Sequence, residues 1–426
     1  MPGRTRRERG GLWRHRDFRL LWAGETTSKL GSNVTTVALP LVAVLALHAG
    51  PFTVGLIAAA VWVPWLVFGL PAGAWVDRLP HRPVMLLCDL VSAAAFLSVP
   101  AAAWLGRLTV GHLVAVALLT GTCSVLFTTA YRVYLPVLVP AADLPEGNAK
   151  LQGSESVAQI AGRGLAGLIA QGVGPVSALL VDAATFLVSA VCLRAIRTQE
   201  PPRPVAPRGT TLRQEIATGL RWVVRDRYLR PLALFSAVAN VALTGYQAIQ
   251  VVFFVQVVGV SPAAVGFLVA ASGVGGVLGA AVATWLARRW GTARSMLISL
   301  LTMAPLGFLI PMATGGPGLI LPAVGGIAIG AAVVAANVLA ASFRQTYPPR
   351  PVQGRVVAFS SLLANGSSAA GALLAGALGA LAGPRGAVWA LMAVLLAATL
   401  IIVVSPIRTN RNLPAAAAQP QVRPAS

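Results

Sequence analysis

The amino-acid sequence predicts an all-helical membrane protein whose twelve transmembrane helices form two pseudo-symmetric six-helix bundles. Of its 426 residues, 56% are apolar and only 11% are charged, whereas about a quarter of the residues of a soluble protein carry charge. The apolar residues gather in long runs, and the two halves of the chain match each other at a constant offset. This composition excludes a water-soluble enzyme.

Twelve apolar runs are long enough to cross the hydrocarbon core of a bilayer, for which a helix needs about 20 residues. Many of them are apolar on every side, so they belong in lipid rather than on the surface of a soluble domain. The predicted spans are 20–47, 52–76, 83–105, 111–135, 154–174, 176–196, 232–258, 262–287, 294–313, 318–342, 357–382 and 386–405.

The net charge of +21 predicts orientation in the membrane rather than nucleic-acid binding. No polar domain carries a basic stripe with interleaved aromatic residues. With both termini inside, 29 of the 33 lysine and arginine residues fall in cytoplasmic segments, and only Arg107 and Arg385 fall in outer loops. Because cytoplasmic loops carry such an excess, we expect a multi-pass protein of the plasma (cell inner) membrane with cytoplasmic N- and C-termini.

An internal repeat divides the spans six and six. The residues that match at an offset of 211 are Pro51, Val54, Gly55, Ala59 and Ala60 with Pro262, Val265, Gly266, Ala270 and Ala271. The predicted segments are a basic cytoplasmic N-tail (1–19), an N-terminal bundle (20–196), a cytoplasmic central loop (197–231), a C-terminal bundle (232–405) and a disordered cytoplasmic tail (406–426). Within the central loop, Thr211–Arg227 predicts an amphipathic helix lying on the membrane surface.

A sequence motif lies between the second and third spans, which are joined by Gly73-Ala-Trp-Val-Asp77-Arg78-Leu-Pro-His-Arg82. This stretch resembles the G-x-x-x-D-R-x-x-x-R signature of major facilitator superfamily transporters, which are built from two six-helix repeats. The resemblance implies a cytoplasmic latch in which Gly73 allows close helix approach. Asp77 would face the positive N-terminus of a helix in the other half, and Arg78 and Arg82 would pair with Asp77 and with lipid. The alternative is that these residues only anchor the loop on the cytoplasmic side through their positive charge.

Further stretches resemble an efflux-type branch of this family, which includes macrolide and siderophore (enterobactin-type) exporters. They are Phe18–Gly24, Ala38–Leu41, Leu135–Pro140 and Phe343–Gln345. One stretch departs from the pattern, because Arg163 stands where many drug–proton antiporters of the family have a proline.

Charged residues inside predicted spans mark the candidate transport site, because ionisable groups at membrane depth are costly and usually functional. Glu25 and Lys29 are spaced i,i+4 on the first span and can pair. Since the first and fifth spans pack together in the resembled family, we expect Glu25, Lys29 and Arg163 to form a buried cluster. It would bind a polar or anionic cargo group with Glu25 as the proton carrier, or it would be a structural ion cluster.

Other polar residues in the spans have more ordinary expected roles. Asn240, Gln247 and Asn337 are candidates for lining the cavity, with helix-to-helix hydrogen bonding as the alternative. We expect Asp89 to pair with Arg132 or with the arginines after the second span. Asp182 is expected to accept hydrogen bonds from serine and threonine hydroxyls.

The sequence predicts a secondary active transporter, not an enzyme. It contains no phosphate-binding glycine loop and no catalytic or metal-ligand constellation, so we expect no cofactor and no metal. The predicted function is export of an amphipathic drug or secondary metabolite by alternating access, coupled to protons, in a monomer surrounded by lipid. An importer, uniporter or lipid flipper is the alternative, and a non-transporting receptor or scaffold is a more distant one.

Overall fold

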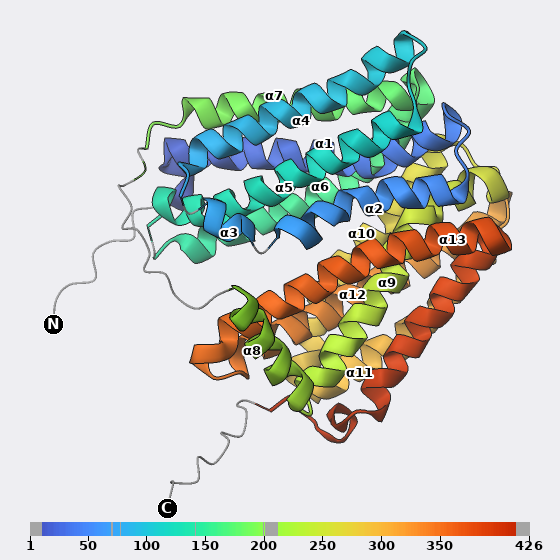
Figure 1. Ribbon diagram of the computed structural model, residues 1–426. Helices are drawn as coiled ribbons and strands as arrows, with labels where there is room; N and C mark the ends of the chain where they lie inside the picture. Colours follow the sequence, from blue (N-terminus) through green and yellow to red (C-terminus); the bar gives the residue numbers. More distant parts are fainter. Residues whose placement is uncertain are drawn as a thin grey trace, which may run out of the picture. The chain divides into compact units, whose positions relative to one another are not determined.

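The computed structural model describes residues 11–69, 71–76, 78–140, 142–198, 200 and 212–414, and within these ranges every regular element is a helix (Figure 1). The helices from the first sequence half are α1 (Arg16–Leu45), α2 (Pro51–Phe68), α3 (Pro71–Val76), α4 (His81–Trp104), α5 (Val110–Leu138), α6 (Leu144–Val173) and α7 (Pro175–Ala195). Those that follow are α8 (Leu212–Arg225), α9 (Leu229–Val252) with η2 (Phe253–Val258), α10 (Pro262–Trp290), α11 (Thr292–Met303) with η3 (Pro305–Leu309), α12 (Ile320–Thr346) and α13 (Arg350–Val404). Short 3-10 turns are η1 (Gly11–Arg14), η4 (Gly316–Leu319) and η5 (Pro406–Thr409).

Each of the twelve predicted spans corresponds to a helix of the structure, which confirms the fold class. The second span is α2 continued by α3. The label α13 covers the last two spans, which are separated where Gly383, with φ +74°, breaks the helix before Pro384. Ten of the described helices are long and apolar enough to cross a membrane, with α13 among them. The more polar α6 begins ten residues before the predicted span, so Glu146 and Lys150 lie within the helix rather than in a loop.

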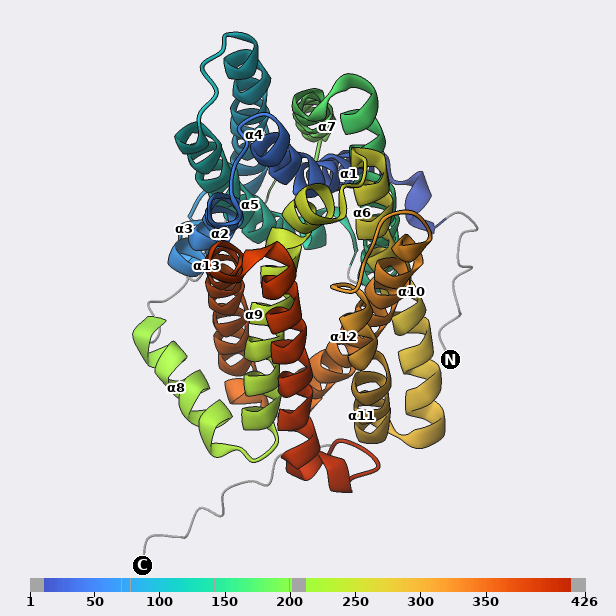
Figure 2. The same cartoon turned by 90° about the vertical axis from the view of Figure 1, so that its right-hand side faces the viewer.

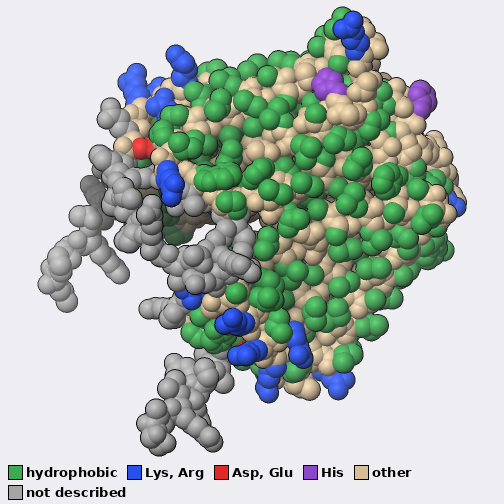
Figure 3. Space-filling model, viewed as in Figure 1, with side chains coloured by type: hydrophobic (Ala, Val, Ile, Leu, Met, Phe, Trp, Pro, Cys, Tyr) green, Lys and Arg blue, Asp and Glu red, His purple; other side chains and the backbone are tan. Residues whose placement is uncertain are grey.

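Hydrophobic side chains are spread over the face shown in Figure 3, while the visible lysine and arginine side chains lie mainly toward its margins. Exposed leucine, valine and tryptophan side chains occur along nearly all of the spans. A soluble protein rarely exposes such large contiguous apolar areas. The surface is therefore typical of a membrane protein.

The chain forms two compact units, and each takes one short segment from the opposite half of the sequence. Unit 1 comprises Met1–Ala49, Val67–Pro207 and Ser261–Ala270, and unit 2 comprises Gly50–Leu66, Arg208–Val260 and Ala271–Ser426. In unit 1, α1 packs on α6 and α7, and α4 packs on α5 and α7. In unit 2, α13 packs along α9, and α11 packs on α12 (Figure 2).

The two segments that belong to the unit of the other sequence half are Gly50–Leu66 and Ser261–Ala270. Each is held in place by a glycine, Gly55 or Gly266, and these two glycines match each other in the internal repeat. In unit 2, a Cβ on Gly55 would lie 2.7 Å from both the Ala372 carbonyl oxygen and the Gly376 Cα. In unit 1, a Cβ on Gly266 would lie 2.8 Å from the Gly167 Cα. Both contacts are too close for any side chain, so each glycine allows two helix backbones to touch, as at small-residue crossings in membrane proteins.

The amphipathic helix predicted in the central loop is α8, but it packs on protein. A Cβ at Gly219 would overlap the Arg355 carbonyl oxygen of α13 and lie 3.1 Å from the Phe359 Cβ. Val223 is buried as well, whereas Leu220 remains exposed. The small residue at 219 thus allows close docking of α8 on α13, and contact of α8 with the membrane surface stays a prediction.

Candidate functional site

The expected pairing of Glu25 with Lys29 is confirmed, and a second carboxylate joins it. The Lys29 Nζ lies 3.6 Å from Glu25 Oε1 on α1 and 3.8 Å from Glu155 Oε1 on α6. Beside them the Thr26 hydroxyl donates to Ser154 Oγ at 3.0 Å, so two polar contacts link α1 and α6. We call Glu25, Lys29 and Glu155 the α1–α6 acidic cluster.

The members of the α1–α6 acidic cluster differ in exposure. The Glu25 side chain is only 10% exposed, whereas Lys29 and Glu155 are 37% and 34% exposed. With both acids ionised, two carboxylates share a single ammonium group, so the cluster carries one excess negative charge. One proton or one cationic group would neutralise this excess charge.

Arg163, the third residue of the expected cluster, lies on α6 two helical turns beyond Glu155. Its neighbour Gly162 packs on α1, where a Cβ would lie 2.7 Å from the Leu30 carbonyl oxygen and from Asn33 Cβ. The ion pairs of Lys29 run to Glu25 and Glu155. The participation of Arg163 in a transport site therefore stays a prediction, and sequence analysis had given Glu155 no role in the ion pair.

The two remaining membrane aspartates have different outcomes. Asp182 is fully buried and accepts hydrogen bonds from the Thr35 hydroxyl and, at 3.2 Å, from the Thr185 hydroxyl, which confirms its expected role. Asp89 is 1% exposed, and its Oδ2 has no hydrogen-bond partner among the described residues. The expected ion pair with Arg132 or with Arg78 and Arg82 is not formed in the described part of the chain, where Asp89 is buried in α4 about two helical turns after Arg82.

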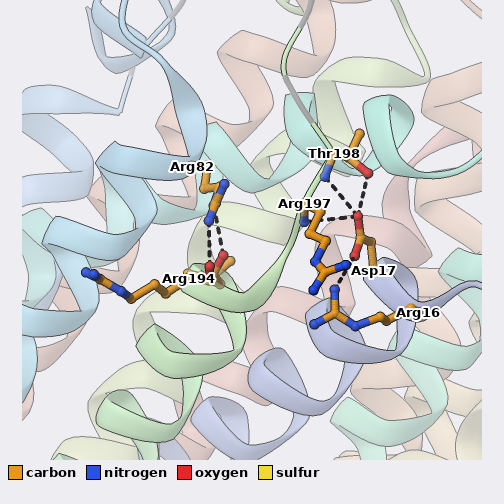
Figure 4. A network of polar contacts seen from close by, with 7 residues as sticks. Arg16, Asp17, Arg82, Arg194, Arg197 and Thr198 are labelled. Carbon is orange, nitrogen blue, oxygen red and sulfur yellow. Dashed lines mark hydrogen bonds and ion pairs between the residues drawn. The ribbon is translucent and has the colours of Figure 1, made fainter.

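The residues of the predicted latch are only partly brought together. Asp77 lies outside the described residues. No described heavy atom lies within 4 Å of a Cβ built on Gly73, so the close helix approach expected there is not formed in this structure. Arg78 is exposed. Arg82 instead donates from Nε to the Leu193 carbonyl at 2.8 Å and from a terminal nitrogen to the Arg194 carbonyl at 2.7 Å, so it caps the C-terminus of α7 (Figure 4).

Two carboxylates without a predicted role, Asp17 and Glu200, connect the segment after α7 to the N-terminal ends of α1 and α4. Asp17 at the start of α1 accepts from the backbone N–H of Arg197 at 3.2 Å and from both the N–H and the hydroxyl of Thr198, at 2.9 and 2.6 Å (Figure 4). The Glu200 carboxylate accepts from the backbone N–H groups of His81 and Arg82 at 2.9 and 2.8 Å. A carboxylate at a helix N-terminus satisfies free N–H groups and opposes the helix dipole.

The same arrangement recurs in unit 2, which gives structural support to the internal repeat. After the last helix, the chain returns to the N-terminus of α11, where Asn412 Oδ1 accepts from the Thr292 N–H at 3.1 Å and the Arg411 carbonyl accepts from the Ala293 N–H at 3.2 Å. The N-terminus of α4 and that of α11 are thus both capped by the segment that follows the sixth helix of their half. The first cap carries charge and the second does not.

Two of the three predicted cavity residues share a cavity inside unit 2. Asn240 of α9 and Asn337 of α12 line it, together with residues of α11 and α13. Gln247 is exposed and lies outside it. Asn240 and Gln247 are seven residues apart on α9 and therefore share a helix face, so the sequence pattern could not show that only Asn240 lies at the level of the cavity.

Comparisons with known proteins agree with this architecture. The model of the Major Facilitator Superfamily matches residues 21–343 and 232–425. Multidrug efflux pump Tap of Mycolicibacterium fortuitum is 28% identical over 373 residues, covering 84% of this chain and 88% of that protein. Its Mycobacterium tuberculosis counterpart is 28% identical over 362 residues, covering 82% and 83%. An uncharacterized MFS-type transporter, y4rN of Sinorhizobium fredii, is 30% identical over 269 residues, covering 62% and 65%.

Solved structures share the fold at low sequence identity. The nucleoside transporter NupG superposes with a TM-score of 0.73 at 12% identity, covering 91% of this chain and 98% of that one. A bacterial homologue of the iron transporter ferroportin, in its inward-facing state, gives a TM-score of 0.72 at 15% identity, covering 91% and 98%. These relatives and structural neighbours are described as efflux pumps or transporters. The chain belongs to the Major Facilitator Superfamily and is a multi-pass membrane transporter.

Proposed function

We propose that the chain is a secondary active exporter of amphipathic small molecules, such as drugs or secondary metabolites, driven by proton antiport through alternating access. The observation that carries the proposal is the similarity to multidrug efflux pump Tap, which extends over most of both chains. The proposed setting is a monomer in the cell inner membrane, with the basic helix ends and both termini in the cytoplasm.

The α1–α6 acidic cluster supports coupling to protons. One proton on Glu25 cancels the excess negative charge and leaves Lys29 paired with Glu155 alone. Losing that proton restores the shared pair, and a cationic cargo group can take its place beside Glu25. Proton and cargo would thus compete for one buried carboxylate, which is a simple way to couple their movements in antiport. In the same scheme Gly73, Asp77, Arg78 and Arg82 control opening on the cytoplasmic side.

Everted inner-membrane vesicles test the proposal with ethidium, a fluorescent cation, as the probe. Vesicles that contain the protein should accumulate ethidium when respiration acidifies their interior, and an uncoupler should abolish the accumulation. Glu25→Gln should lower it at least about tenfold, because a neutral amide neither carries a proton nor attracts a cation. Glu146→Gln is the matched control, since Glu146 lies on the same helix pair but bonds Lys150 at 2.7 Å near the helix end.

The same vesicles separate the alternatives. Uptake that persists with the uncoupler would indicate a uniporter, and movement in the opposite direction would indicate an importer. Full uncoupler-sensitive transport by Glu25→Gln would eliminate Glu25 as the proton carrier. Loss of transport of every responding compound in Asp77→Asn would support the latch, and unchanged export would refute it.

A further inference from the structure

A cavity lies within unit 2 that no part of the proposed proton coupling uses. Its walls come from α9, α11, α12 and α13, four helices of the same unit that are visible together in Figure 2. Its volume is about 50 Å³. A cavity volume of about 10–15 Å³ is needed for one water-sized group. The cavity can therefore hold a chemical group of about three to five heavy atoms.

The lining is apolar except for four uncharged polar side chains. Leucine, isoleucine, valine, alanine and phenylalanine form most of the wall, and the polar members are Ser236, Asn240, Asn337 and Thr399. They come from three helices and line the same small volume. An apolar pocket with a few convergent polar groups is the usual form of a small-molecule site.

Hydrogen-bonding capacity remains available at each polar residue. Asn240 uses one N–H on the Ser236 carbonyl at 2.7 Å, which leaves its second N–H and its oxygen. Thr399 donates to the Leu396 carbonyl at 2.6 Å, which leaves its hydroxyl oxygen as an acceptor. Within the described residues, the Asn337 amide and the Ser236 hydroxyl make no side-chain hydrogen bond. The cavity therefore offers both donors and acceptors.

We propose that this cavity binds an uncharged hydrogen-bonding group of the cargo, such as a primary or secondary amide or a hydroxyl pair. No lining residue carries a charge, and an ionic group placed there would lose its hydration without gaining a counter-charge. An amide or hydroxyl would instead exchange water for the asparagine, serine and threonine side chains. The inference rests on the proposed function, since it defines part of the cargo that such a transporter would accept.

The chemistry of the cavity differs from that of the α1–α6 acidic cluster. The cluster attracts protons and cations, whereas the cavity selects neutral polar groups. Variants of the two should therefore affect different compounds. A cavity variant should change the handling of an uncharged amide and leave a permanent cation such as ethidium largely unaffected.

Equilibrium dialysis of radiolabelled chloramphenicol against the purified full-length protein in detergent micelles tests the inference. Chloramphenicol is uncharged and carries an amide and two hydroxyl groups. We expect saturable binding by the wild type, weakened about tenfold in Asn337→Leu and about threefold in Thr399→Val, since each removed hydrogen bond contributes about 0.5–1.5 kcal/mol. Thr399→Val keeps the shape of the side chain, so it guards against a general folding defect.

The matched control is Asn365→Leu, which makes the same change on α13 at a position outside the cavity lining. Its affinity for chloramphenicol should equal that of the wild type. Equal affinity of Asn337→Leu and Asn365→Leu, or a wild type without saturable binding, would overturn the inference. Ethidium accumulation in vesicles decides the proposed function separately: a wild type that exports ethidium but lacks a cavity-dependent chloramphenicol site would refute only the inference.

Discussion

The ion pairs of Lys29 should contribute unequally to stability, and the structure gives the expected order. Lys29 Nζ and Glu25 Oε1 are 3.6 Å apart, a distance at which Coulomb's law gives about 4.6 kcal/mol at an effective dielectric constant of 20 and about 1.2 kcal/mol in water. Glu25 is nearly buried, but Lys29 is 37% exposed. Since desolvation offsets part of the attraction, we expect a coupling free energy of about 1–3 kcal/mol.

The pair of Lys29 with Glu155 should be weaker. Its distance is 3.8 Å, and both side chains are about one-third exposed. Solvent-exposed ion pairs typically contribute about 0.2–1 kcal/mol. The predicted coupling of Lys29 with Glu155 is therefore below about 1 kcal/mol.

Two double-mutant cycles measure both couplings. The first uses Lys29→Met, Glu25→Gln and the double variant, and the second replaces Glu25→Gln with Glu155→Gln. The free energy of unfolding is followed by tryptophan fluorescence during SDS titration in mixed micelles. Additivity within about 0.5 kcal/mol in the first cycle, or a larger coupling in the second cycle than in the first, would refute the reasoning. Strong coupling in the first cycle together with full transport by Glu25→Gln would identify a purely structural ion cluster.

Three further changes have expected outcomes. Gly31→Ala should destabilise the protein by about 1–3 kcal/mol, because its Cβ would overlap Thr185 Oγ1 and crowd Asp182 Oδ1; thermal unfolding checks this against Gly164→Ala, which meets no neighbour within 4 Å. Glu200→Gln should lower the free energy of unfolding by about 1 kcal/mol, and this effect should shrink as the salt concentration rises from about 0.05 to about 1 M. Asn412→Ala at the uncharged cap of α11 should show no such dependence, and an equal salt response of both variants would contradict the charged-cap explanation. Burial and the hydrogen bond to Asp226 raise the pKa of Tyr347 above its ordinary value of 10.0, so the native state favours the protonated hydroxyl and loses this contribution as the pH rises above 10.0. Tyr347→Phe should remove that part of the pH dependence of the melting temperature, and an unchanged slope would disprove it.

Local features of the sequence were sufficient to predict part of the candidate site. Glu25 and Lys29 pair because residues four apart share one face of any helix, so the pairing needed no tertiary information. Asp182 was recognised as a hydroxyl acceptor because a lone carboxylate inside an apolar helix must find donors from its neighbours. Glu155 and Glu200 were missed as partners, because each acts on a helix more than a hundred residues away in the chain.

The amino-acid sequence alone determined the spans and the duplication, because hydrophobic length and repeated residues are properties of the chain itself. The orientation in the membrane, which the arginine distribution predicts, stays a prediction. Only the tertiary structure decided how the matched glycines are used, since Gly55 and Gly266 meet helices that no local pattern could select. It also decided that Asn240 and Asn337 share a cavity while Gln247 lies outside it. The physical reason is the same in each case: helix propensity and hydrophobicity fix which segments cross the membrane, but packing between helices fixes which faces meet.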